Sequence, residues 1–157
     1  MMYRKAVIFG IKGTQLTKDE KYFFKCNKPW GIILFSRNVK NSFQLKTLIN
    51  NIKKNVNDKN YPILIDQEGG RVSRLNKIID LSLFSQGYFG KLYEDDKFSF
   101  LKRYEIHINM ICEILKKAGV NINIAPVADV RSKNSHRIIG NRSFSEKSSI
   151  VTKIGKL

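Results

Sequence analysis

The residues best suited to bind a ligand lie in one short stretch from Asp66 to Arg74, which combines acids, arginines and a Gly-Gly pair. The apolar residues 62–65 come directly before it and are typical of a strand that is covered on both faces. In α/β proteins, polar groups at the carboxyl end of such a strand are commonly presented to a ligand. The stretch therefore predicts a polar ligand site at the end of a buried strand.

Short apolar strands alternate with amphipathic helices along the whole chain. The strands are expected at residues 6–11, 31–36, 61–66 and 121–125. Thr17 and Glu20 form a capping-box pattern for a helix that runs to about Lys25, and Ser42 is expected to cap the next helix. A further helix is expected to begin near Glu146. One strand–helix unit every 30 residues or so predicts a parallel sheet with right-handed crossovers.

Residues 67–96 form a long irregular segment rich in glycines and aromatic residues, which is typical of a functional loop or lid. A helix over residues 98–118 follows, and Gly119 is its expected C-terminal stop. The apolar spacing predicts that this helix buries one stripe of side chains. The stripe consists of Leu101, Ile108, Ile111, Ile114 and Leu115.

Polar clusters follow the carboxyl ends of the second, third and fourth expected strands. They are Arg37-Asn38, residues 66–74 and residues 129–142. Clustering at one end of the strands fits a (β/α)₈ barrel, in which sites lie at that face. A doubly wound sheet is the alternative, but its G-x-G-x-x-G fingerprint is absent. The predicted fold is α/β, a partial TIM barrel of about the first four βα units.

The net charge of +16 raises nucleic-acid binding as a function, but the lysines are spread along every segment without a basic run or stripe. We therefore expect no nucleic-acid partner. No apolar run is long enough to cross a membrane, and the apolar run after Lys5 is too short for a secretory signal, so we expect a cytoplasmic protein without a membrane partner. Cys26 and Cys112 lack metal-site spacing and are expected to be buried free thiols. No metal or cofactor is expected.

Four segments resemble glycoside hydrolase family 3, and specifically its bacterial cytoplasmic β-N-acetylglucosaminidases of peptidoglycan recycling. These segments read GIILFSRN, IDQEGGRVSRL, IAPVADV and IGNRSF, in the order and with the spacing of the family. The resemblance implies hydrolysis of terminal non-reducing N-acetylglucosamine residues from muropeptides by a retaining mechanism. It covers residues 1–157 but only the N-terminal half of the family's barrel domain.

By this resemblance, Asp66 accepts hydrogen bonds from sugar hydroxyls, and Arg74 and Arg142 line the same pocket and donate to oxygens. No catalytic residue is assigned. The family's acid/base histidine and aspartate nucleophile lie in segments without a counterpart here, and neither His107 nor His136 stands in the required motif.

Structural roles remain open beside the binding roles. Asp66 could cap a loop, Arg74 could pair with Glu68 or Asp66, and Arg142 could brace its loop. For Glu68 the structural role leads, as a brace for the glycine loop or for an arginine. For Asp129 a scaffolding role is favoured in the same way, and the departures from the family pattern at Ala128 and Asn141 are mild.

A barrel typically needs roughly 250 residues, so the 157-residue chain is expected to be the truncated N-terminal part of one. The alternative to hydrolase function is an inactive fragment or a sugar-binding remnant. An open barrel edge at the fourth expected strand, with Ile122 and Ile124, would also expose unpaired strand groups, which predicts self-association.

Overall fold

The computed structural model describes residues 3–132, 134 and 136–157. The chain divides into two compact units. The first unit comprises Met1–Asp66, Arg74–Ile79 and Cys112–Asn123, and the second comprises Gln67–Ser73, Asp80–Ile111 and Ile124–Leu157. Each unit has its own packed interior.

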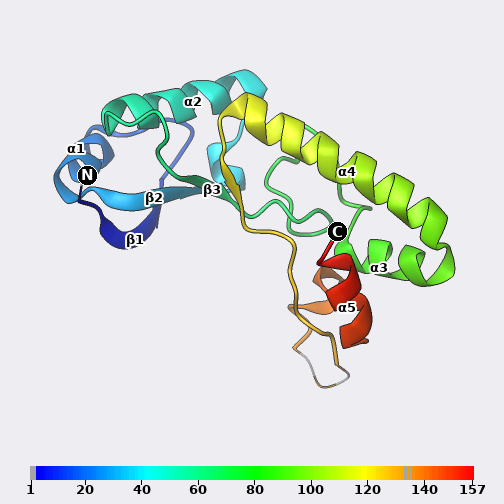
Figure 1. Cartoon of the computed structure of the whole chain (residues 1–157). Coiled ribbons are helices and arrows are strands. Elements are labelled where there is room, and N and C mark those ends of the chain that lie inside the picture. The colour runs from blue at the N-terminus through cyan, green and yellow to red at the C-terminus, as the bar shows by residue number, and fades with distance from the viewer. Residues whose placement is uncertain (1–2, 133, 135) are drawn as a thin grey trace. The chain divides into compact units, whose positions relative to one another are not determined.

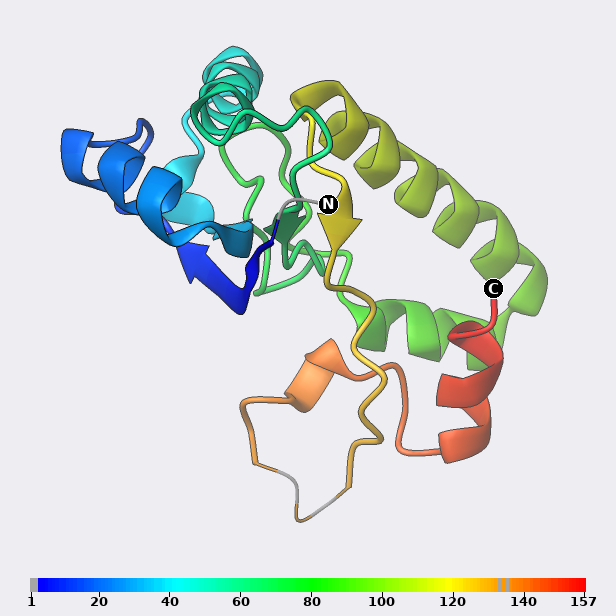
Figure 2. The same cartoon turned by 60° about the vertical axis from the view of Figure 1, so that its left-hand side comes forward.

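The first unit contains a parallel sheet of four strands in the order β1-β2-β3-β4. The strands are β1 (Lys5–Gly10), β2 (Pro29–Leu34), β3 (Ile63–Ile65) and β4 (Ile122–Asn123). Helices α1 (Lys18–Asn27) and α2 (Ser42–Asn55) connect the first three strands and lie on the same face of the sheet (Figures 1 and 2). Consecutive parallel strands in chain order confirm the expected α/β architecture with crossover helices.

Helices α1 and α2 both begin where a side chain satisfies the first free backbone amides. Thr17 Oγ1 accepts from the Glu20 amide while the Glu20 carboxylate accepts from the Thr17 amide, which confirms the predicted capping box. The prediction that Ser42 caps α2 is wrong by one residue. Asn41 has the extended backbone of an N-cap and its side chain accepts from the Gln44 amide at 2.8 Å.

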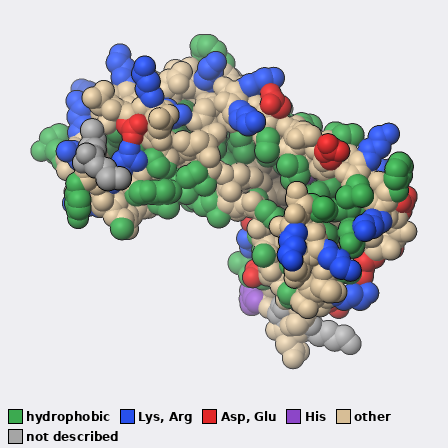
Figure 3. Space-filling view, in the orientation of Figure 1, with side chains coloured by type: hydrophobic (Ala, Val, Ile, Leu, Met, Phe, Trp, Pro, Cys, Tyr) green, Lys and Arg blue, Asp and Glu red, His purple; other side chains and the backbone are tan. Residues whose placement is uncertain are grey.

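The core of the first unit lies between the sheet and α2. Side chains from β2, β3 and one face of α2 are fully or almost fully buried there. They are Ile32, Leu34, Ile63, Ile65, Leu45, Leu48, Ile49 and Ile52. β1 differs, because it is an edge strand with Val7 36% and Ile8 42% exposed. Figure 3 shows hydrophobic side chains gathered on the surface where β1 and β2 lie in Figure 1.

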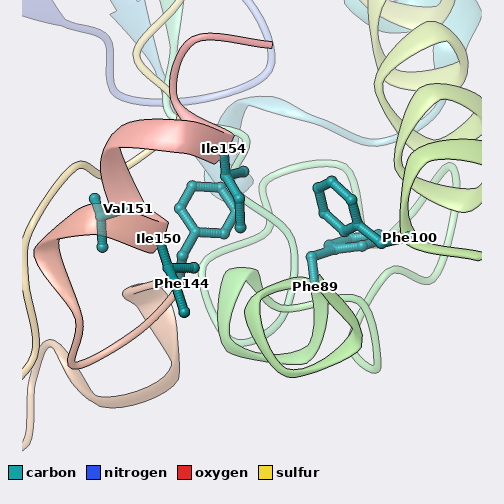
Figure 4. Packing of buried hydrophobic residues seen from close by; sticks show 6 residues of the cluster. All are labelled: Phe89, Phe100, Phe144, Ile150, Val151 and Ile154. Atoms are coloured by element: carbon teal, nitrogen blue, oxygen red, sulfur yellow. The ribbon is translucent and has the colours of Figure 1, made fainter. Parts of the chain in front are cut away.

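The second unit is built on α3 (Gln86–Asp95), the first part of α4 (Lys97–Ala118) and α5 (Ser148–Ile154). The prediction that residues 67–96 are irregular is therefore wrong for their last third. Ser85 caps α3 by accepting from the Tyr88 amide, and this helix buries Phe89. The hydrophobic core of the unit, shown in Figure 4, consists of Phe89, Phe100, Phe144, Ile150, Val151 and Ile154.

The buried stripe of α4 agrees with the expected one at Ile111 and Leu115 and differs from it elsewhere. Leu101 and Ile108 are 43% and 38% exposed. The residues of α4 that are buried are Phe100, His107, Ile111, Leu115 and Ala118. These positions also follow helical spacing. The spacing of apolar residues therefore allowed either of two neighbouring stripes of α4 to be buried, and packing selected the stripe that contains His107. Gly119 ends the helix with φ of 96°, as predicted.

Cys26 and Cys112 are free thiols, but both are exposed. The expectation of burial is wrong because each lies on the solvent side of its helix, while Phe24 and Ile111 beside them take the buried positions. Among the described residues, no helix is both long and apolar enough to span a membrane.

Candidate functional site

Asp66 follows β3 directly and forms a two-pronged ion pair with Arg74. Arg74 Nε donates to Asp66 Oδ1 at 2.6 Å, and Nη2 donates to Oδ2 at 2.5 Å. Both side chains belong to the first unit and are about a quarter exposed, at 23% and 24%. Of the structural alternatives for Arg74, pairing with Asp66 is the one observed.

This pair leaves the carboxylate able to bind further donors. A carboxylate has about four lone-pair sites, and a two-pronged guanidinium takes one on each oxygen. The pairing therefore fixes the orientation of Asp66 without using all of its acceptor capacity. Such a carboxylate can accept from hydroxyl groups of a ligand that approaches its exposed side.

The end of β2 supports Arg74 through an aromatic ring. The guanidinium of Arg74 lies 5.6 Å from the centre of the Phe35 ring, and that of Arg37 lies 4.6 Å from it. Arg37 also donates to the carbonyl of Ile11 at 2.9 Å. Asn38 is fully buried and donates to the carbonyls of Ile11 and Gly13. Asn38 thus braces the segment after β1 from a buried position, while Arg37 supports the same segment and stays exposed.

In the second unit, Glu68 and Arg142 form an equivalent pair. Arg142 Nε donates to Glu68 Oε2 at 2.9 Å and Nη2 donates to Oε1 at 2.7 Å. The Glu68 side chain is 3% exposed, whereas that of Arg142 is 24% exposed. The prediction that Glu68 braces an arginine is confirmed. The contact also supports the alternative that Arg142 braces its loop.

Gly69 and Gly70 form the turn that places Glu68. Their φ angles are +89° and +59°, a region that side chains rarely adopt. A Cβ atom at Gly69 would overlap the carbonyl oxygen of Phe84, and one at Gly70 would lie 2.7 Å from Ser85 Cβ. The turn therefore requires glycine for both its conformation and its close approach to the segment before α3.

Two buried amide side chains, at Gln67 and Gln86, were missed by sequence reasoning. Gln67 is 1% exposed and its Nε2 donates to Ser73 Oγ at 3.0 Å, which ties the two ends of the glycine turn together. Gln86 binds both backbone groups of Val127, at 2.8 and 2.9 Å. No local signal identified Gln86, because α3 itself was not predicted.

Asp129 contributes its backbone rather than its exposed side chain, since its carbonyl accepts from Ser143 Oγ at 2.7 Å. This contact agrees with the scaffolding role favoured for it. Within residues 3–132, 134 and 136–157, no three His, Cys, Asp or Glu side chains gather as a metal site would require.

One hollow of the first unit, of about 240 Å³, lies at the opposite ends of the strands from Asp66. It is lined by Pro29 at the start of β2 and by Tyr61 before β3. Tyr61 donates to the Pro29 carbonyl at 2.9 Å, and burial raises its pKa to about 12. This hollow shares no residue with the two ion pairs.

The structure thus brings Asp66 and Arg74 into contact and joins Arg142 to Glu68. It orients each guanidinium by a carboxylate, which suits recognition of ligand oxygens. That Asp66, Arg74 and Arg142 line one pocket stays a prediction.

Proteins of known sequence and structure resemble this chain over most of its length. It is 30% identical over 153 residues to a beta-hexosaminidase of Xanthomonas campestris pv. campestris (strain B100), which covers 92% of this chain and 43% of that protein. It is 34% identical over 133 residues to beta-hexosaminidase A of Pseudoalteromonas piscicida, covering 80% of this chain and 21% of the relative.

Solved structures of related enzymes are also similar to this chain over most of its length. NagZ from Neisseria gonorrhoeae is similar with a TM-score of 0.83 and 28% identity, over 96% of this chain and 43% of that one. A glycoside hydrolase family 3 β-N-acetylglucosaminidase from Paenibacillus sp. str. FPU-7 has a TM-score of 0.74 and 25% identity, over 94% of this chain and 27% of its own. The four-stranded sheet is accordingly part of a barrel.

The chain spans less than half the length of these relatives. Residues 8–157 match the family described as the glycosyl hydrolase family 3 N terminal domain. The chain therefore belongs to glycosyl hydrolase family 3.

Proposed function

We propose that these 157 residues form the sugar-holding part of a β-N-acetylhexosaminidase. The full activity would remove terminal non-reducing N-acetylglucosamine from peptidoglycan-derived muropeptides, with retention of configuration. Family membership and relatives named beta-hexosaminidase support the reaction class. The observation that carries the proposal is the Asp66–Arg74 pair, an oriented and about one-quarter exposed carboxylate at the carboxyl end of β3.

In this proposal Asp66 accepts from sugar hydroxyls, while Arg74 and Arg142 donate to sugar oxygens. Bonds of this kind involve a charged partner and are stronger than neutral ones. A retaining glycosidase also needs a nucleophile and an acid/base group, and we assign neither to a residue of this sequence. Binding groups accelerate a reaction only together with the groups that perform it. These 157 residues alone are therefore expected to bind the sugar without cleaving it.

The same proposal includes residues 1–157 as the N-terminal part of the family's barrel domain, a role in peptidoglycan recycling and a cytoplasmic location. All three rest on the family resemblance. The second candidate is a sugar-binding remnant without a hydrolytic role. This candidate is retained because the region that matches is less than half the length of each relative.

An Asp66→Asn substitution tests the sugar site directly. We expect the dissociation constant for N-acetylglucosamine to rise about 10- to 100-fold, because hydrogen bonds to a charged group are worth about 1.5–3 kcal/mol. Titration followed by NMR would measure it, with the exposed Asp95→Asn as the charge-matched control. Equal affinity of Asp66→Asn and Asp95→Asn would refute the site. If the purified chain cleaved a chromogenic N-acetylglucosaminide and Asp66→Asn did not, the expectation that these residues bind the sugar without cleaving it would be wrong.

We further propose that the chain self-associates through β1. This edge strand exposes apolar Val7 and Ile8 and has a strand on one side among the described residues. The net charge of +16 opposes contact between copies, so added salt should strengthen association by screening the repulsion.

Sedimentation at low and high salt would measure this association. Ile8→Lys should shift the chain to monomer, because a charge on an edge strand blocks pairing. Ile106→Lys, which alters an exposed isoleucine of the second unit, is the control and should leave association unchanged. A monomer at every salt concentration would rule the proposal out.

A further inference from the structure

His107 is a buried histidine that the proposed sugar site does not use. It lies on α4 in the second unit, is 5% exposed, and its Nδ1 has no hydrogen-bond partner within the described part of the chain. Its ring centre lies 4.8 Å from that of Phe89 and 5.8 Å from that of Phe84. A polar ring among aromatic rings, with an unsatisfied nitrogen, is costly to bury and calls for an explanation.

The same ring lies against the glycine turn. A Cβ atom at Gly69 would lie 3.7 Å from His107 Cε1, which places the Gly69 backbone in the immediate surroundings of the imidazole. Phe84 lies beside both, since its carbonyl contacts Gly69 and its ring contacts His107. The next residue, Gly70, donates from its amide to the Leu81 carbonyl at 2.9 Å. Movement of the His107 ring would therefore disturb the support of the whole turn.

The turn in turn sets the position of Glu68. The amides of Glu68 and Gly69 both donate to the Val72 carbonyl, at 3.1 and 3.2 Å. Glu68 is the carboxylate that holds the guanidinium of Arg142. A chain of direct contacts thus leads from His107 through Gly69 and Glu68 to Arg142.

We propose that His107 is a positioning residue, whose neutral ring supports the Gly69–Gly70 turn and whose protonation loosens the hold of Glu68 on Arg142. The effect on sugar binding rests on the proposed function of Arg142, whereas the positioning of Glu68 by His107 is independent of that function. Affinity for the sugar would then weaken in mild acid.

The surroundings of His107 do not compensate a positive charge. On the elements packed around it, the titratable groups that are buried or half-buried are Tyr104 on α4, Tyr88 and Tyr93 on α3, and Glu68 in the turn. The exposed ones include Arg103 on α4, Arg71 in the turn and Asp80 before α3. Glu68 is paired with Arg142, and the Asp80 carboxylate accepts from the Ser82 amide. Burial lowers the pKa of His107 below its ordinary value of 6.5 and raises that of Tyr104.

The direction of the pH effect follows from this shift. A folded-state pKa below the unfolded value means that the unfolded chain binds more protons between the two values. The contribution of His107 to the stability of the second unit is therefore complete above about pH 6.5 and is lost as the pH falls toward the lower folded-state pKa. Each unit of separation corresponds to a tenfold change in the opening equilibrium.

Amide hydrogen exchange and thermal melting of the chain test the proposal without any sugar. Between about pH 7.5 and pH 5.5 we expect the protection factors of the Gly69 and Gly70 amides to fall about tenfold, and the melting temperature to decrease. His107→Leu has a similar volume and no proton to gain, so it should abolish both effects. His136→Gln is the matched control, because His136 is exposed, and it should behave like the unaltered chain.

Three results would overturn the proposal: unchanged protection in mild acid, an acid effect that survives in His107→Leu, or one that is lost in His136→Gln. If His107→Leu does not fold, NMR titration of the two histidines in the unaltered chain decides. His107 must then titrate below its ordinary pKa of 6.5 and in step with the Gly69 and Gly70 amide signals. Loss of sugar binding in Asp66→Asn concerns the first unit, so the two proposals can fail separately.

Discussion

A Gly90→Ala substitution is expected to destabilise the second unit by about 3 kcal/mol, because one methyl group there has no space. A Cβ atom at Gly90 would overlap the carbonyl oxygen of Phe144. The backbone of α3 therefore lies directly against the segment that carries Phe144, whose ring is 2% exposed in the core. Either α3 or this segment must move, and the packing of Phe89 and Phe144 shown in Figure 4 would be lost.

Gly13→Ala is the matched control for this change. A Cβ atom at Gly13 would meet nothing within 4 Å, so its effect should stay within about 0.5 kcal/mol. Chemical denaturation with fluorescence and near-UV circular dichroism would compare the two variants. Equal stability of Gly90→Ala and Gly13→Ala would contradict the close approach of α3 to Phe144.

An Arg142→Met substitution should destabilise the second unit by about 3–5 kcal/mol. The substitution leaves the Glu68 carboxylate, 3% exposed, without the guanidinium that neutralises it. An unpaired buried charge costs far more than the net worth of the pair itself. Adding Glu68→Gln to Arg142→Met should therefore restore much of the lost stability.

Arg131→Met serves as the control for removing an arginine from the same unit. Its ion pair with Glu146 spans 3.4 Å and both side chains are exposed by a third or more, so we expect a loss below about 1 kcal/mol. Urea denaturation of the single and double variants would give the coupling energy of Glu68 and Arg142. A coupling energy near zero would show that the carboxylate does not depend on Arg142.

The sequence by itself determined the order of the parallel strands and the family. The strands were recognisable because short apolar runs stop at polar residues, as at Leu34 and Ile65. The start of α1 was recognisable because capping is a local interaction between Thr17 and Glu20. The glycine turn was visible as a motif, and its need for positive φ follows from local conformation alone.

Only the tertiary structure decided which face each helix buries and which charges pair. Periodicity allowed α4 to bury Leu101 and Ile108, but packing against the second unit's aromatic residues buries Phe100 and His107 instead. The exposure of Cys112 follows from the same choice of face.

Charge pairing could not be assigned from spacing for a related reason. Glu68 lies close in sequence to Arg71 and Arg74, yet its carboxylate binds Arg142, 74 residues away. Gln86 similarly binds Val127 across 41 residues. Such contacts depend on where the folded backbone brings distant segments together. Local spacing offers a charged side chain several possible partners, and burial selects one of them.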